Sequence, residues 1–178
     1  MREDAATRGP EEAGAPSAVR VGVLTVSDLG AAGRRADASG DAIVSWAAAR
    51  GFVVTAREIV PDESDRIAAV LARWADGAVA DVILTTGGTG LAPRDVTPEA
   101  TRAVLDKEAP GLAEAIRAAG RERTPRAALS RGLAGVRARA LIVNLPGSVR
   151  GVKEGLAVLE PLLEHAVQLL AEAQTDHG

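Results

Sequence analysis

Two hydrophobic periodicities alternate along this chain of 178 residues, and the alternation limits the folds open to it. Runs of β-branched and aliphatic residues, typical of buried strands, are each followed by a stretch whose apolar residues recur at helical spacing. The sequence predicts strands over 19–26, 52–60, 81–85 and 140–144. It predicts helices over 37–50, from 64 with Ser64 as the N-cap, over 97–107, over 112–119 and from 148 onward. Strands that alternate with helices imply right-handed crossovers and a mostly parallel sheet covered on both faces. We therefore predict an α/β fold.

The ends of the chain and two internal segments complete this outline. Residues 1–17 are polar and rich in Pro and Gly, which predicts a disordered tail, and residues 174–178 are expected to fray. Residues 18–173 are long enough for one domain with a substantial core. Within it, 127–134 is predicted to be a strand, and Pro161 is predicted to kink or restart the last helix.

Composition excludes several classes of protein. The formal net charge is −3 and there is no Tyr, whereas nucleic-acid binders carry a basic surplus and aromatic stacking residues. The absence of cysteine excludes disulfides, thiolate metal sites and cysteine nucleophiles. The apolar runs are too short to span a bilayer, and the N-terminus has no apolar signal-peptide core. We expect a cytoplasmic protein with neither a nucleic-acid nor a membrane partner.

The loops after the predicted strands are the places where the sequence becomes polar, acidic or glycine-rich. They are 27–28, 61–63, 86–95 and 144–148. Parallel α/β sheets bind ligands beyond the carboxyl ends of their strands, and a parallel sheet gathers these ends along one edge. We therefore expect one active site built from all four loops.

The stretch from 85 to 101 reads TTGGTGLAPRDVTPEAT and joins a predicted strand to a predicted helix. Thr97 is predicted as the helix N-cap, with Pro98 at the first helical position. A glycine turn at a helix start can hold an anion against backbone amides, although glycines also serve ordinary tight turns. The pattern is neither a P-loop nor the dinucleotide fingerprint. Ser148 is predicted to cap a second such helix beside the first, with Lys153 and Glu154 in its early turns, and this favours a phosphate ligand.

Asp62 and Asp95 are the acids best placed for chemistry, since each follows a predicted strand at the loop edge. Each also has an ordinary interpretation, Asp62 as a turn residue and Asp95 as a cap for nearby backbone. Two carboxylates beside phosphate-binding loops would suit Mg²⁺, and Asp28 is a third candidate. Neither His165 nor His177 lies in a predicted loop, so a Ser-His-Asp hydrolase is not expected.

These motifs together resemble the signature of the MogA/MoaB family of molybdenum cofactor biosynthesis, which includes the gephyrin G domain and its plant counterpart. The segments that carry the resemblance are 85–90 (TTGGTG), 93–101 (PRDVTPEAT), 144–148 (NLPGS), 27–28 (SD), 37–40 (DASG) and 61–63 (PDE). They occur in the order and at the spacing of the family. The resemblance covers residues 19–171, nearly the whole predicted domain.

The resemblance implies a three-layer αβα sandwich, a homotrimer, and binding of molybdopterin and of ATP with Mg²⁺. Active members transfer AMP from ATP to the terminal phosphate of molybdopterin, release pyrophosphate, and supply the product for hand-over to a molybdenum-insertion protein. Asp62 and Asp95 match the catalytic, metal-binding aspartates. The expected ligand-binding residues are Ser27, Asp28, Ser39, Thr86, Gly87, Gly88, Thr89, Gly90, Arg94, Asn144, Pro146, Gly147, Ser148, Lys153 and Glu154.

Two other functions remain compatible with the sequence. The first is a non-catalytic molybdopterin-binding or scaffold protein of the MoaB type, and the second is another nucleotide-dependent enzyme such as a pyrophosphatase. The paired aspartates favour the adenylyltransferase, because a passive carrier gains nothing from negative charge beside phosphates.

Overall fold

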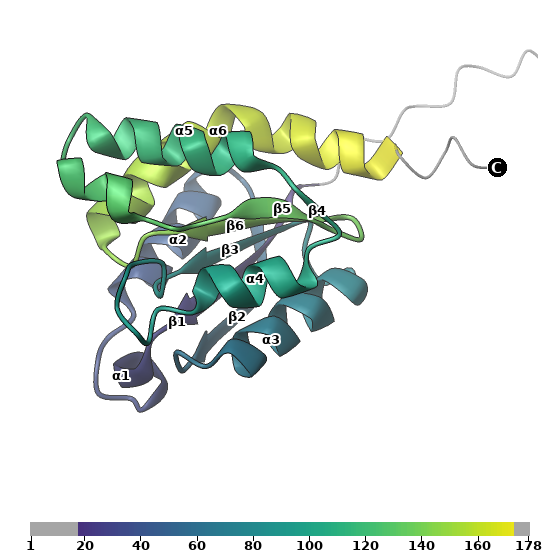
Figure 1. Ribbon diagram of the computed structural model, residues 1–178. Helices are drawn as coiled ribbons and strands as arrows, with labels where there is room; N and C mark the ends of the chain where they lie inside the picture. The colour runs from purple at the N-terminus through teal and green to yellow at the C-terminus, as the bar shows by residue number, and fades with distance from the viewer. Residues whose placement is uncertain (1–17, 173–178) are drawn as a thin grey trace, which may run out of the picture.

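The computed structural model describes residues 18–172, which form a six-stranded sheet with helices on both faces (Figure 1). The strands are β1 (Arg20–Val26), β2 (Val53–Val60), β3 (Val82–Thr86), β4 (Lys107–Glu108), β5 (Ala134–Arg137) and β6 (Ala140–Leu145). The helices are α1 (Asp28–Ala31), α2 (Ala38–Ala49), α3 (Ser64–Asp76), α4 (Thr97–Val104), α5 (Pro110–Arg121), the 3₁₀ helix η1 (Pro125–Leu129) and α6 (Val149–Glu172). The predicted tail at 1–17 and the predicted frayed end at 174–178 lie outside the described residues.

The sheet is mostly parallel, which confirms the predicted fold class. Its strand order is β2-β1-β3-β6-β5-β4; the pairings among the first four strands are parallel, and β5 and β4 pair antiparallel at one side. In register, Thr86 of β3 lies between Thr25 of β1 and Leu145 of β6, and Val26 lies beside Val60 of β2. The four parallel strands therefore end at the same edge, as predicted.

Each face of the sheet has its own apolar core. Successive side chains of a strand point to opposite faces. Val21 and Val23 of β1 pack on the face covered by α2, α5 and α6, whereas Leu24 and Val26 pack on the face covered by α3 and α4 (Figure 1). Burial of each such side chain contributes about 1.5–3 kcal/mol. The two cores make the sheet the central layer of a rigid three-layer support for the loops at its edge.

The predicted caps of two helices are wrong by one residue. Ser64 is the first residue of α3, and Glu63 is the N-cap without a side-chain capping bond. Thr97 is likewise the first residue of α4, because its hydroxyl donates instead to the Gly87 carbonyl at 2.9 Å. The same helix ends at Val104, not near 107, since the chain then becomes extended and joins the sheet as β4. The short helix α1 and the strand β4 were not predicted.

Two further predictions near the C-terminal half differ from the structure. Residues 127–134 do not form a strand, because the chain first makes η1, which Thr124 caps, and enters β5 only at Ala134. The last helix does not restart at Pro161, which α6 includes in one continuous element. Within 18–172, no helix is both long enough and apolar enough to cross a bilayer.

Candidate active site

The loops after β3 and β6 contact each other directly at the carboxyl edge of the sheet. The Thr86 hydroxyl donates to the Pro146 carbonyl at 2.7 Å, and the Gly87 N–H donates to the Leu145 carbonyl at 3.3 Å. A Cβ placed on Gly147 would lie 3.2 Å from the Gly87 Cα, so the two backbones approach closely. The glycine turn (residues 86–90) and the 144–148 loop therefore form one surface, as the sequence predicted.

Two residues of the glycine turn have backbone conformations that favour glycine. Gly87 and Gly88 have φ angles of 97° and 65°. A Cβ at Gly87 would lie 2.3 Å from the Val26 carbonyl oxygen, and one at Gly88 would lie 2.3 Å from Thr97 Oγ1. The Thr97 N–H in turn donates to the Gly88 carbonyl at 3.1 Å. The glycines are thus required by the turn itself, whether or not it also binds an anion.

Asp62 and Asp28 join the loops after β2 and β1. The N–H of Asp28 donates to Asp62 Oδ2 at 2.9 Å, and the N–H of Asp62 donates to Asp28 Oδ1 at 3.0 Å. Arg94 adds a two-point ion pair, with its Nε 3.0 Å from Asp28 Oδ2 and its Nη2 2.7 Å from Asp28 Oδ1. Asp28 and Arg94 are largely exposed, with side-chain exposures of 43% and 60%, and they form the rim of the site.

Asp62 and Asp95 each lie close to a glycine of the turn. A Cβ on Gly88 would be 3.2 Å from Asp62 Oδ1, and one on Gly90 would be 2.8 Å from Asp95 Oδ2. Asp95 Oδ2 also accepts the Ala92 N–H at 3.0 Å, so this aspartate caps its own loop and not α4. The two acids therefore belong to the same corner of the molecule.

The electrostatics of this corner favour a cation. Burial raises the pKa of Asp62, and the negative charges of Asp28 and Asp95 raise it further, against the opposing effects of the Asp28 N–H and of Arg94. No cluster of three or more carboxylate or histidine ligands exists within residues 18–172. One or two carboxylates are enough for Mg²⁺ when phosphate oxygens and water complete its coordination. The two aspartates therefore fit a magnesium ion that arrives with a phosphate ligand.

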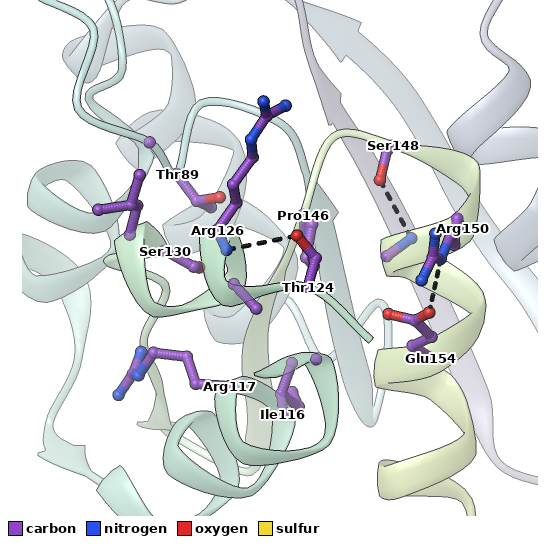
Figure 2. A pocket seen from close by; sticks show the side chains of 15 residues that line it. Thr89, Ile116, Arg117, Thr124, Arg126, Ser130, Pro146, Ser148, Arg150 and Glu154 are labelled. Carbon is purple, nitrogen blue, oxygen red and sulfur yellow. Dashed lines mark hydrogen bonds and ion pairs between the residues drawn. The ribbon is translucent and has the colours of Figure 1, made fainter. Parts of the chain in front are cut away.

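Residues of the glycine turn line two cavities. The first has a volume of about 430 Å³, and the predicted residues Thr89, Gly90, Pro146, Ser148 and Glu154 line it. In Figure 2, α6 forms one wall with the Arg150–Glu154 ion pair, and η1 and α5 form the facing wall. The second cavity, of about 330 Å³, is lined by Ser27, Ser39, Asp62, Thr86, Gly87, Gly88 and Gly147. Consecutive residues of one turn thus serve both cavities.

Comparison with known proteins identifies the family. A family model described as a probable molybdopterin binding domain matches residues 22–165. The chain belongs to the MogA/MoaB family of molybdenum cofactor biosynthesis. A solved structure titled molybdopterin biosynthesis enzyme MoaB, from Thermus thermophilus, is 56% identical with a TM-score of 0.81, over 85% of this chain and 96% of that one. A molybdopterin adenylyltransferase from Helicobacter pylori is 40% identical over 154 residues, 85% of this chain and 88% of the relative.

Some relatives are much longer than this MogA/MoaB-family chain. The molybdenum cofactor synthesis protein cinnamon of Drosophila melanogaster is 47% identical over 156 residues, which are 86% of this chain but 26% of that protein. The chain spans 22% of gephyrin from Dictyostelium discoideum and 51% of a bifunctional molybdenum cofactor biosynthesis protein from Synechococcus elongatus. The match to these proteins therefore concerns one part of each.

Four of the predicted ligand-binding residues line neither cavity, and the predicted catalytic Asp95 lines neither cavity either. Two of the four are Asp28 and Arg94, the exposed ion pair described above, and the other two are Asn144 and Lys153. Asn144 is buried, and its amide nitrogen donates to the hydroxyls of Thr85 and Thr101 at 2.9 Å each. Its side-chain oxygen accepts the Leu133 N–H at 3.0 Å, so the side chain supports the loops from behind. Lys153 is exposed on the side of α6 that faces α2, in a separate groove with Trp46.

Sequence reasoning missed two residues that shape this MogA/MoaB site. Asp37 lines the second cavity with a carboxylate that is 6% exposed, where it accepts the Thr25 hydroxyl and the Gly40 N–H and pairs with Arg57. Asp37 could have been found from the sequence, because it is the first residue of the 37–40 motif and stands at the N-cap of a helix. Arg131 contacts the loop that carries Asp95, and no periodicity in the sequence pointed to it.

Proposed function

We propose that this protein is a molybdopterin adenylyltransferase, which transfers AMP from ATP to the terminal phosphate of molybdopterin and releases pyrophosphate. The observation that carries the proposal is that Asp62 and Asp95 lie against Gly88 and Gly90 of one glycine turn, and that this turn contributes residues to two cavities. Two adjacent cavities suit two substrates that must react with each other. The proposal includes the homotrimeric assembly, the cytoplasmic location and the hand-over to a molybdenum-insertion protein.

The chemistry requires no activated side chain as nucleophile. A terminal phosphate oxygen of molybdopterin attacks the α-phosphorus of ATP and forms a new P–O bond. The bond from the α-phosphorus to the oxygen that bridges it to the β-phosphorus breaks, and pyrophosphate leaves with that electron pair. The protein has to align the two phosphates and compensate their charge. A turn of glycines beside a helix N-terminus supplies backbone amides for that purpose.

Each group of residues then has a proposed part in the reaction. The glycine turn, with Ser148 and its loop, binds the phosphates of the two substrates, and Ser27 and Ser39 bind ligand in the second cavity. Asp62 and Asp95 would hold Mg²⁺, which when bound neutralises phosphate charge. The fit rests on Asp62, whose Oδ1 has no hydrogen-bond partner among residues 18–172 and whose pKa is raised chiefly by burial.

The product of the reaction tests the proposal directly. The purified protein is incubated with molybdopterin, ATP and Mg²⁺, and adenylylated pterin and pyrophosphate are measured. We expect both in equal amounts, and neither with an ATP analogue whose α–β bridge is a methylene group. Tight binding of molybdopterin without product would instead identify the non-catalytic MoaB-type carrier. Hydrolysis of pyrophosphate without adenylylated pterin would identify a pyrophosphatase.

A further inference from the structure

Arg131 makes an unusually complete set of hydrogen bonds to a single loop. It follows η1, in the segment that leads into β5. Its backbone N–H donates to the Thr89 carbonyl at 2.8 Å, its Nε donates to the Gly90 carbonyl at 2.8 Å, and its Nη2 donates to the Asp95 carbonyl at 2.7 Å. The guanidinium also forms an ion pair with Glu99 of α4. One residue thus contacts both ends of the loop from 89 to 95.

That loop has few other attachments within the described part of the chain. Residues 91–94 are exposed, and the hydrogen bonds internal to the loop join only Ala92 and Asp95. Arg94 reaches outward to Asp28, but both partners of that ion pair are largely exposed, and exposed pairs contribute little. Thr97 bonds the carbonyls of Gly87 and Gly88 and so holds the backbone just outside the loop. Arg131 bonds the end carbonyls of the loop itself, at Thr89, Gly90 and Asp95.

We infer that Arg131 is a positioning residue for the adenylyl transfer proposed above, because it fixes the backbone that carries Asp95 and the last residue of the glycine turn. The inference rests on the proposed function for its consequence in catalysis. Arg131 itself lines neither cavity and acts through the loop. It also joins that loop to Ser130, which lies in the wall of the first cavity in Figure 2. The wall and the aspartate therefore have a fixed spacing.

The chemistry of the side chain explains why an arginine occupies this position. A guanidinium has five N–H donors in a rigid plane, so it can bond two carbonyl groups and a carboxylate at once. A lysine ammonium at the same place is a single point charge on a flexible stem and could keep one of these partners with good geometry. A glutamine side chain is neutral, so it cannot form the ion pair with Glu99, and it is too short to reach all the partners of the guanidinium. Lys and Gln therefore remove the side-chain contacts in graded steps, while the backbone hydrogen bond to the Thr89 carbonyl remains.

Arg137 supplies a matched control on the other end of β5. Its Nη1 donates to the Val104 carbonyl at 2.8 Å, and its guanidinium forms a two-point ion pair with Asp76. It therefore makes the same kinds of bond as Arg131, but to α3 and to the end of α4, not to the loop from 89 to 95. Arg137→Gln therefore measures how much stability and activity are lost when any arginine with such bonds is removed.

The experiment compares wild type, Arg131→Gln, Arg131→Lys and Arg137→Gln by two readouts. The first is amide hydrogen exchange of peptides covering 88–96 in the free protein, and the second is kcat and KM for adenylyl transfer. In Arg131→Gln only, we expect the exchange rate in 88–96 to rise about tenfold or more and kcat to fall about 10–100-fold. A loss of that size in rate is what misplacement of a catalytic group produces. Arg131→Lys should fall between, and Arg137→Gln should keep wild-type values of both.

The readouts separate failure of this inference from failure of the proposed function. Wild-type exchange in 88–96 for Arg131→Gln would overturn the positioning role whether or not the protein is an enzyme. Equal losses of kcat in Arg131→Gln and Arg137→Gln would also overturn it, since the effect would then be one of general stability. A wild-type protein that makes no adenylylated pterin would refute the adenylyltransferase, while the exchange data would still decide whether Arg131 holds the loop.

Discussion

Asp28 and Asp62 hold each other by a reciprocal pair of hydrogen bonds, in which the backbone N–H of each donates to the carboxylate of the other at 2.9 and 3.0 Å. The pair joins the loop after β1 to the loop after β2. It uses one oxygen of Asp62 and leaves the other without a hydrogen-bond partner within residues 18–172, beside the glycine turn. Asp28 therefore fixes the direction in which the proposed catalytic carboxylate presents its open oxygen.

Replacement of Asp28 should distinguish this positional role from an effect of charge. Asp28→Ala removes the acceptor for the Asp62 N–H and should lower kcat about tenfold through misplacement of the carboxylate. Asp28→Asn keeps a carbonyl oxygen of the same shape in the same place, so it should lose clearly less activity. Steady-state kinetics of the two variants decide the matter. Equal losses would show that the charge of Asp28, and not its hydrogen bond, is what matters.

Gly88→Ala should destabilise the protein and weaken ATP binding together. The new Cβ would meet Thr97 Oγ1 at 2.3 Å, at a φ of 65° that L-residues rarely adopt. We expect a loss of about 2–3 kcal/mol of folding stability, measured by urea unfolding, from backbone strain and displacement of Thr97. Gly33→Ala is the control for strain alone, because Gly33 has a φ of 68° with nothing within 4 Å of its Cβ. Equal losses of folding stability in the two variants would show that the close contact between the new Cβ and Thr97 at position 88 has no effect.

The Arg20–Asp81 pair should make stability depend on pH in a predictable direction. Burial acts to raise the pKa of Asp81, but hydrogen bonds from the Arg20 side chain and backbone outweigh it, and the net pKa is lowered. A carboxyl group whose pKa is lower in the folded state stabilises the folded protein at pH values above its unfolded pKa, which is about 3.9. This stabilisation is lost as the pH falls through the pKa of the folded state.

Asp81→Asn should therefore be less stable than wild type at pH 7, by about 1 kcal/mol because Arg20 is partly exposed and screened by solvent. The difference between the two proteins should shrink at pH 3 or below. Urea unfolding midpoints at both pH values give the measurement, with Glu114→Gln, an exposed residue of α5, as the control. A constant difference at both pH values would show that the charge of Asp81 does not contribute.

The sequence predicted the sheet edge and its loops because these depend on local patterns. The β-branched runs around Val23 and Ile142 have a period and a length that define buried strands, and parallel pairing then brings their ends together. Two of the glycines of the turn are equally local, since the backbone angles at Gly87 and Gly88 require them. Asp28 and Asp62 were predicted from their positions just after β1 and β2, and Asp95 from its place in the loop between the glycine turn and α4.

Other features depend on contacts between distant segments and were not predictable in the same way. Arg131 reaches Asp95 across 36 residues of sequence, and Asn144 reaches Thr85 across 59. Lys153 is a different case, because successive residues of a helix are 100° apart on its surface. A helix that turns Glu154 toward the first cavity turns Lys153 toward α2, so helical periodicity alone argued against grouping the two.

The most direct test of the account is single-turnover formation of adenylylated molybdopterin by Asp62→Asn and Asp95→Asn, beside wild type and Glu63→Gln. Asparagine keeps the shape of each side chain, and Glu63 is an exposed neighbour of Asp62. The account predicts that each aspartate variant loses about 100-fold or more of the rate of transfer, with molybdopterin binding and thermal stability close to wild type, while Glu63→Gln keeps the full rate. Transfer by both aspartate variants within twofold of wild type would contradict it.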